Sequence, residues 1–355
     1  MPKRCARNAP PSAAQTALAI LATVVGAGFA SGREVMVFFT RYGAWSWVGV
    51  AVATLTFGVL VFGIMRLSAR TGAGSFAQLC TNVLGGAAGK LFAAMYALLM
   101  LITAGAMVSG VGEIAAISMT IPHAYELGLG AAVILGVIWA RRGVHALATG
   151  GGFLLPVCGL LYLVIAWRGR EYVSLQAAHP VVSWLPTLPL AVGYACLNVT
   201  LCCGILSEIA SRSDAEYHRK TAMWFIPMIG GLLAAANATL MPHIARVEYA
   251  PLPMLILARG SIPAALLATA TLLIAMMTTL TALIRSLAQL IARLEPNGRF
   301  HIPEWAGYLT AALLVVGAGV IGFSRLIGVA YPLMGWGSAV ALVGLLVVGK
   351  ARKTP

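Results

Sequence analysis

The chain has few charged residues. Only 10% of its 355 residues are Asp, Glu, Lys or Arg, and just ten residues are acidic. A water-soluble globular protein carries about 25% charged residues, so this composition excludes that class. The disordered, collagen-like and disulfide-rich secreted classes also need compositions that this chain lacks. Hydrophobic residues make up 60% of the chain and the mean hydropathy is +0.90, so a multi-pass membrane protein remains.

Motifs of common catalytic and metal centres are also missing. The sequence has no HExxH, paired-Asp or GxSxG motif, so a membrane-embedded enzyme is disfavoured. It has no ring-forming filter motif of a channel. The six cysteines show no zinc-site spacing and lie mostly in apolar runs, where cysteine usually acts as a small apolar residue. The pair Cys202–Cys203 leaves a soft-metal site as a minor alternative, and no other cofactor is expected.

The net charge of +14 does not indicate a nucleic-acid partner. The 24 Lys and Arg residues are scattered between apolar runs and form no basic stripe. If the N-terminus is cytoplasmic and the runs alternate in direction, 17 of these 24 residues fall on the cytoplasmic side. Membrane proteins carry this bias in their cytoplasmic loops, so both termini are predicted to be cytoplasmic and the partner is the lipid bilayer.

Ten apolar runs predict the fold class. Lipid leaves no alternative to a helix for an apolar run without barrel-like alternation, so we expect an all-α membrane protein with ten transmembrane helices. The approximate runs are 13–40, 44–66, 90–117, 124–140, 143–167, 184–209, 220–242, 260–291, 303–322 and 326–349.

The runs divide into two similar halves of five. In each half the second and third runs are separated by a longer connection, and the first such connection places Phe76, Leu79 and Val83 at helical spacing. An odd number of spans per half puts the two connections on opposite faces, which is the outline of an inverted repeat. The predicted organisation is a cytoplasmic tail at 1–12, repeats at 13–167 and 184–349, and a cytoplasmic tail at 350–355.

The start of the chain also imitates a signal peptide, because a basic segment precedes a short apolar run. The repeat favours retention of this first run.

The first run of each half is interrupted by glycine or polar residues. Three glycines and a serine fall within residues 26–32 of run one, and run six contains Gly193-Tyr194 and Asn198-Val199-Thr200. Gly-interrupted segments at matching positions of two halves indicate the binding site of a transporter, so helices 1 and 6 are both expected to be broken. The alternative is that these glycines permit close helix packing.

Residues 26–34 read Gly-Ala-Gly-Phe-Ala-Ser-Gly-Arg-Glu. This stretch resembles the GAGFASGQE signature of the YkvI family of bacterial membrane proteins, in the amino acid–polyamine–organocation superfamily, which has the LeuT fold. The resemblance covers the whole chain in span number and loop pattern, and it implies a bacterial inner-membrane location. One departure is Arg33, which replaces the usual Gln; a charge there alters the outer gate or the ligand preference.

The resemblance also implies a substrate site and a sodium site. Unwound amides near Ala27 and Gly28 would hold an anionic group, and the substrate-binding stretch would comprise Gly26, Ala27, Gly28, Phe29 and Ser31. Carbonyl groups of Ala22 and Val25 would bind sodium, together with an Ala-x-x-Thr-Thr pattern that supplies Ala275, Thr278 and Thr279. Hard cations prefer such oxygens. The alternative is that Thr278, Thr279 and Thr281 bond their own helix backbone.

Two pairs of residues would line the side-chain end of a small ligand. Tyr194 and Asn198 are four residues apart and share one face of span six, and Thr103 and Met107 do the same on span three. The alternative is that Tyr194 anchors packing and Asn198 bonds a neighbouring helix.

Charged residues in the spans are candidates for gating or coupling. Arg33 or Arg41 would pair with Glu113 as an outer gate, and Glu208 with Arg285 as an inner gate. Snorkelling without a mechanistic role is the alternative for these side chains. A partly buried carboxylate is able to exchange protons, so Glu34 keeps a proton-coupled carrier open.

These observations favour a sodium-coupled symporter of an amino acid or related amine-bearing solute, working by alternating access. A proton-coupled carrier and a ligand sensor that does not transport are the alternatives.

Overall fold

The structure, a computed structural model, describes residues 12–74, 76–142, 156–167, 185–292 and 303–351. Every regular element in these ranges is a helix. Most of the two expected tails and the first part of the fifth apolar run, 143–155, lie outside the described residues.

Seven helical segments of the described ranges are long and apolar enough to cross a membrane. Their outer faces carry exposed aliphatic side chains such as Leu55 and Val59, as a lipid-facing surface requires. The main helices of these segments are α4 (Ser46–Thr71), α6 (Gly86–Ser118), α7 (Ala124–Arg142), α9 (Thr187–Ala210), α10 (Ala215–Leu240), α13 (Ile262–Ala292) and α16 (Tyr331–Ala351). Two shorter apolar helices are Pro156–Trp167 and α14 (Glu304–Gly319).

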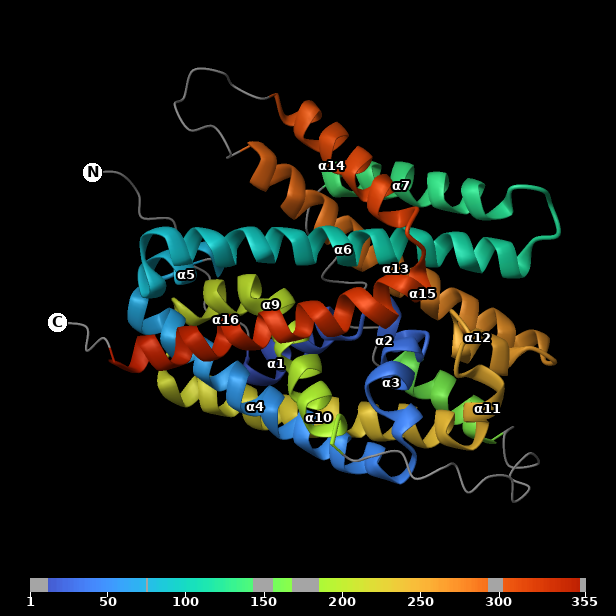
Figure 1. Cartoon of the computed structure of the whole chain (residues 1–355), viewed down its shortest axis with the longest axis horizontal. Coiled ribbons are helices and arrows are strands. Elements are labelled where there is room, and N and C mark those ends of the chain that lie inside the picture. Colours follow the sequence, from blue (N-terminus) through green and yellow to red (C-terminus); the bar gives the residue numbers. More distant parts are fainter. Residues whose placement is uncertain (1–11, 75, 143–155, 168–184, 293–302, 352–355) are drawn as a thin grey trace.

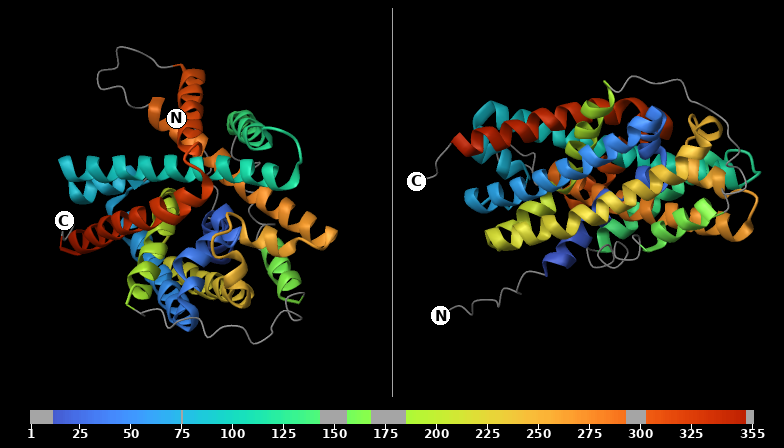
Figure 2. Two further views of the ribbon diagram at one scale, coloured as in Figure 1. Left: turned by 45° about the vertical axis from the view of Figure 1, so that its right-hand side comes forward. Right: turned by 90° about the horizontal axis from the view of Figure 1, so that it is seen from below.

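The helices pack in two groups. In the first, α1 (Ala13–Val24), α4, α9, α10 and α16 contact one another; in the second, α6, α7, α13 and α14 do so. In Figure 1, α7 and α14 lie on one side of the long α6, and α4, α9 and α10 lie on the other. The right-hand view of Figure 2 shows α4 and α10 running side by side. The site considered below lies where the first apolar segment passes between the groups.

That first segment is not one helix. α1 ends at Val24, α2 spans Ala27–Ala30 and α3 spans Arg33–Phe38. Val25 leaves the helical conformation with ψ of 67°, and Gly26 N donates to Val24 O at 2.8 Å. The second bend uses Gly32, whose φ of +80° favours glycine. The segment continues into η1 (Thr40–Trp45) and α4.

The expectation that helix 6 is broken was wrong, because α9 is continuous from Thr187 to Ala210. Its polar side chains bond within the helix: Asn198 Nδ2 donates to Tyr194 O at 3.0 Å, and Thr200 Oγ1 donates to Cys196 O at 2.8 Å. Gly193 lies where α9 and α16 approach each other closely, since a Cβ on Gly335 of α16 would lie 2.9 Å from Gly193 O. The packing alternative therefore holds for this helix.

The two long connections contain short helices. The first forms α5 (Phe76–Leu84), and the predicted helical face of Phe76, Leu79 and Val83 is buried. The second connects α10 to α13 and contains η3 (Met241–His243), α11 (Ile244–Val247) and α12 (Pro253–Ala258). Between α14 and α16 lie α15 (Phe323–Arg325) and the π-helix η4 (Leu326–Ala330).

Candidate functional site

The restart of the first segment leaves backbone groups without helical partners. Because α2 begins at Ala27, the amides of Ala27, Gly28 and Phe29 have no carbonyl acceptor within α2. Phe29 O accepts a hydrogen bond from the Tyr162 hydroxyl at 3.0 Å, and the two rings are 6.1 Å apart. The interruption is therefore held from the side by the helix Pro156–Trp167.

The threonines expected at a sodium site lie on α13, which packs against α2. Thr279 faces the interruption: a Cβ on Gly26 would lie 3.7 Å from Thr279 Oγ1. Thr278 Oγ1 donates to Ile274 O and Ala275 O, at 2.8 and 3.1 Å. Thr281 Oγ1 donates to Met277 O. Thr278 and Thr281 therefore bond their own helix backbone, as the alternative expected, and Thr279 is the threonine of this pattern whose hydroxyl oxygen lies near the interruption.

The carbonyl groups assigned to sodium flank the same point. Val25 is the C-cap of α1 and Ala22 lies in its last turn, where carbonyl groups lose their helical donors. Ala275 is fully buried on α13. The described part of the chain contains no group of three or more His, Cys, Asp or Glu residues that could hold a metal ion, so a cation here would depend on neutral oxygens.

Glu34 lies on α3 and packs against Gly28 of α2. Its side chain is 4% exposed and folds back across the second bend, where a Cβ on Gly28 would overlap the Glu34 carboxyl group. Oε2 makes no hydrogen bond with any described residue. The Tyr194 hydroxyl of α9 lies against this carboxyl group, and it too makes no hydrogen bond of good geometry. Two buried polar groups thus lie beside each other without a well-formed hydrogen bond between Oε2 and the hydroxyl.

Aromatic rings fix Tyr194 in place. Its ring is fully buried, with ring centroids 5.1 Å from those of Phe38 and Phe39 and 5.9 Å from that of Phe57. The structure therefore brings Tyr194 to the first segment, but in a closed aromatic cluster.

The other expected ligand residues are buried around this region. Asn198 is 3% exposed, and its amide group is bonded to α9. On α6, Met107 is 1% exposed and Thr103 is 3% exposed, and Thr103 Oγ1 donates to Leu99 O at 2.8 Å. The Thr103 side chain also lies beside the Tyr331 hydroxyl.

The end of α2 is attached to the connection between α10 and α13. Ser31 Oγ donates to Gly28 O at 3.0 Å and accepts from Arg33 N at 3.2 Å. Ser31 O accepts a hydrogen bond from Met254 N at 2.9 Å, and Arg33 Nη1 donates to Glu248 O. The bend and the connection therefore form one hydrogen-bonded unit.

The expected gate pairs do not form among the described residues. Glu208 lies 3.8 Å from Arg212 on the same helix, whereas Arg285 Nη1 donates to Ala140 O of α7 at 2.9 Å. Arg33 bonds the connection, and Glu113 of α6 lies near Tyr125 of α7. Arg33, Glu208 and Arg285 each contact a nearer group, so the predicted long-range pairs are wrong for this conformation.

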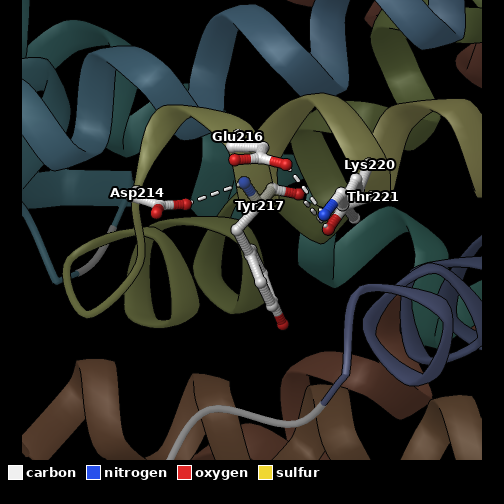
Figure 3. Close-up of polar contacts among 5 residues, drawn as sticks. All are labelled: Asp214, Glu216, Tyr217, Lys220 and Thr221. Carbon is white, nitrogen blue, oxygen red and sulfur yellow. Dashed lines mark hydrogen bonds and ion pairs between the residues drawn. The ribbon is translucent and has the colours of Figure 1, made fainter.

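A polar contact joins α1 to the start of α10. Asp214 caps α10 by accepting from Tyr217 N at 2.8 Å, and Glu216 pairs with Lys220 at 2.8 Å (Figure 3). The Tyr217 hydroxyl lies 2.6 Å from Thr16 Oγ1 of α1. This contact fastens α1 to α10 at the end of α1 away from the interruption.

Sequence reasoning missed Tyr162 and Tyr331. Both are buried, and both lie within electrostatic range of Glu34. A lone tyrosine in an apolar run carries no local signal, so only the packing of distant helices reveals that these tyrosines lie near Glu34.

No family model matches the chain. Among curated proteins, it is 26% identical over 353 residues to the membrane protein YkvI of Bacillus subtilis (strain 168), covering 96% of this chain and 97% of that protein. It is 24% identical over 338 residues to the protein YyaD of the same strain, covering 93% of this chain and 95% of that protein.

Two solved structures share the fold. Mhp1, a nucleobase-cation-symport-1 family transporter in a closed conformation with bromovinylhydantoin bound, gives a TM-score of 0.65 at 16% identity, covering 95% of this chain and 78% of Mhp1. A Na⁺-coupled sialic acid symporter in a substrate-bound outward-open state gives 0.61 at 12% identity, covering 95% of this chain and 79% of the symporter. Both are transporters rather than enzymes. The chain is a homologue of the YkvI membrane protein and has the LeuT-like fold of these transporters.

Proposed function

We propose that this chain is a secondary transporter that moves a small solute by alternating access, coupled to sodium. The observation that carries the proposal is the interrupted first segment, which faces Thr279 of α13 at Gly26. Discontinuous helices of this kind supply backbone groups to substrate and ion in transporters. The printed title of one structural neighbour names Na⁺ coupling, in agreement with the oxygen ligands near Gly26.

The proposed topology has ten spans. We count α1 to α3 as one span, add Pro156–Trp167 and α14 to the seven candidate spans, and keep 13–167 and 184–349 as inverted repeats. Both termini are placed in the cytoplasm of a bacterial cell, following the Lys and Arg bias. In this arrangement α1, α4, α9 and α10 rock against α6, α7, α13 and α14, because most helix contacts lie within each of these two groups.

The proposed substrate is an amino acid or related amine-bearing solute. Gly26, Ala27, Gly28, Phe29 and Ser31 supply the backbone site, because the free amides of the first turn of α2 suit a carboxylate. Thr103, Met107, Tyr194 and Asn198 are assigned to the side-chain end. Of the charged residues, Arg33 and Glu34 lie at the bend and are kept for gating or coupling, as are Glu113, Glu208 and Arg285 in other conformations.

Sodium is expected to stabilise the purified protein against thermal unfolding, because a ligand that binds only the folded state raises its stability. NaCl would raise the melting temperature more than KCl or choline chloride at equal ionic strength. Thr279→Ala is expected to raise the sodium concentration needed for half of this stabilisation by at least about tenfold. Removing a group that only supports a metal ligand already lowers metal affinity by about this factor.

The matched control is Thr281→Ala, two residues along α13, whose hydroxyl bonds Met277 O. It should retain the sodium response of the unmodified protein. Equal responses to sodium and potassium, or an undiminished response in Thr279→Ala, would contradict the sodium site.

Amino acids with a free carboxylate are expected to be the ligands that raise the melting temperature in a library of amino acids and amines, and their methyl esters are expected to fail. The reason is that backbone amides bind the anionic group and lose this contact when it is esterified. Uptake of a hit into proteoliposomes under a sodium gradient then tests transport. Binding without concentrative uptake would instead identify a sensor, and hits that bind equally well as esters would refute the carboxylate site.

A further inference from the structure

Glu34 carries an ionisable carboxyl group in a buried position, where a charged group is unfavourable. It is 4% exposed, and its carboxyl group lies directly over Gly28, on the far side of the Ser31–Gly32 bend. Only a residue without a Cβ leaves room for the carboxyl group at position 28. The glycine and the glutamate, one on α2 and one on α3, therefore form a single packed unit.

No cation neutralises this carboxyl group among the described residues. The neighbouring Arg33 is directed to Glu248 O, and Arg41 and Glu248 are the charged groups that interact with Arg33. No described ion pair includes Glu34.

The titratable groups of other helices that interact electrostatically with Glu34 are tyrosine hydroxyls. Tyr194 comes from α9, Tyr162 from Pro156–Trp167 and Tyr331 from α16. The Tyr162 hydroxyl is engaged by Phe29 O, and the Tyr331 hydroxyl lies beside Thr103. The Tyr194 hydroxyl and Glu34 Oε2 are left without a hydrogen bond in the described structure. Tyr194 is thus the direct counterpart of the carboxyl group.

The occupant that fits this place is a proton. Burying an anionic carboxylate without a cation is very unfavourable, whereas a neutral carboxyl group needs only a hydrogen-bonding partner. The rings of Phe38, Phe39 and Phe57 pack around Tyr194, so this side of the contact is lined by apolar aromatic groups. A protonated Glu34 donates its O–H to the Tyr194 hydroxyl oxygen, and this satisfies both groups after a small adjustment.

We propose that Glu34 and Tyr194 form a proton-binding site, distinct from the sodium site near Gly26 and Thr279. In the packed conformation the Glu34 carboxylate takes up one proton. When α3 moves relative to α2, water reaches the carboxyl group and the proton leaves. The use of this proton in coupling rests on the proposed function, whereas its binding does not.

Infrared difference spectroscopy of the protein in lipid bilayers tests the site with the proton itself as the probe. We compare spectra recorded at about pH 5 and about pH 9. The difference spectrum of the unmodified protein is expected to contain the C=O band of a carboxyl group that is protonated at the lower pH. Glu34→Gln should remove this band. Tyr194→Phe should shift its frequency, because the variant keeps the ring but loses the hydroxyl partner. Glu126→Gln is the matched control, because Glu126 is an exposed carboxylate near His123.

The infrared results test the proton site independently of the transport measurements. A band that persists in Glu34→Gln would overturn the proton site. A band that disappears when NaCl is added at constant pH would also overturn it, because it would identify a metal site instead. If Glu34→Gln fails to fold, the Tyr194→Phe spectrum decides: a shifted band supports the site and an unshifted band overturns it. A titrating Glu34 band in a protein that accumulates no solute would refute only the proposed function.

Discussion

Replacing Gly28 by alanine is expected to displace the Glu34 carboxyl group and abolish transport. A Cβ at residue 28 would overlap the carboxyl group, and Glu34 is buried, so its side chain would have to displace neighbouring groups in order to move. Overpacking of this kind costs about 1–3 kcal/mol and sometimes more. The expected measurements are a lower melting temperature of the purified protein and loss of solute uptake in proteoliposomes.

The control for Gly28→Ala is Gly231→Ala. Gly231 lies in α10, and a Cβ there would have no atom within 4 Å, so stability should be kept. A double-mutant cycle identifies the cause: if the overlap is responsible, Gly28→Ala combined with Glu34→Ala should deviate from additivity by about 0.5–3 kcal/mol in the stabilising direction. Strict additivity would mean that Gly28 acts through something other than Glu34.

Replacing Gly335 by leucine is expected to prevent α9 and α16 from packing. The first carbon of the new side chain would lie 2.9 Å from Gly193 O, 3.1 Å from Gly193 C and 3.4 Å from Gly193 Cα. These are backbone atoms that cannot rotate away, so the helices must separate. Small residues at such contacts let membrane helices approach closely. The yield of folded protein and its melting temperature should both fall steeply.

The same contact provides a graded comparison. A Cβ on Gly193 would find its nearest neighbour, Gly335 C, at 3.7 Å, which is ordinary van der Waals contact. Gly193→Ala should therefore be tolerated, whereas Gly335→Ala should already lower the melting temperature. Equal stability of the two alanine variants would contradict the close approach of α9 and α16.

The span positions could be predicted from sequence because apolar runs have to become helices in lipid. The run at 44–66 corresponds to Ser46–Thr71, and that at 90–117 to Gly86–Ser118. The interruption at Val25 and Gly26 lies at the start of the glycine-rich stretch. The same reasoning failed for α9, because isolated glycine and polar residues occur both at helix breaks and within continuous, closely packed helices. In α9 Asn198 bonds its own helix and Gly193 admits α16.

The candidate site could be predicted only where local signals exist. The resemblance pointed to Thr279, whose Oγ1 does lie near Gly26, while its role as a sodium ligand stays a prediction. The gate pairs failed because pairing depends on helix rotation and on nearer partners, such as Arg212 for Glu208 and Ala140 O for Arg285. The contact between Glu34 and Tyr194 joins residues 160 positions apart in the sequence, which no periodicity encodes.

The hydrogen bonds from Met254 N to Ser31 O and from Arg33 to Glu248 O fasten one surface loop to the bend at two points. Between these points Tyr249 is 82% exposed. A fluorescent dye attached at position 249 would therefore follow the motion of α2 and α3 without occupying the interior, and would give an optical record of the working cycle from outside the protein.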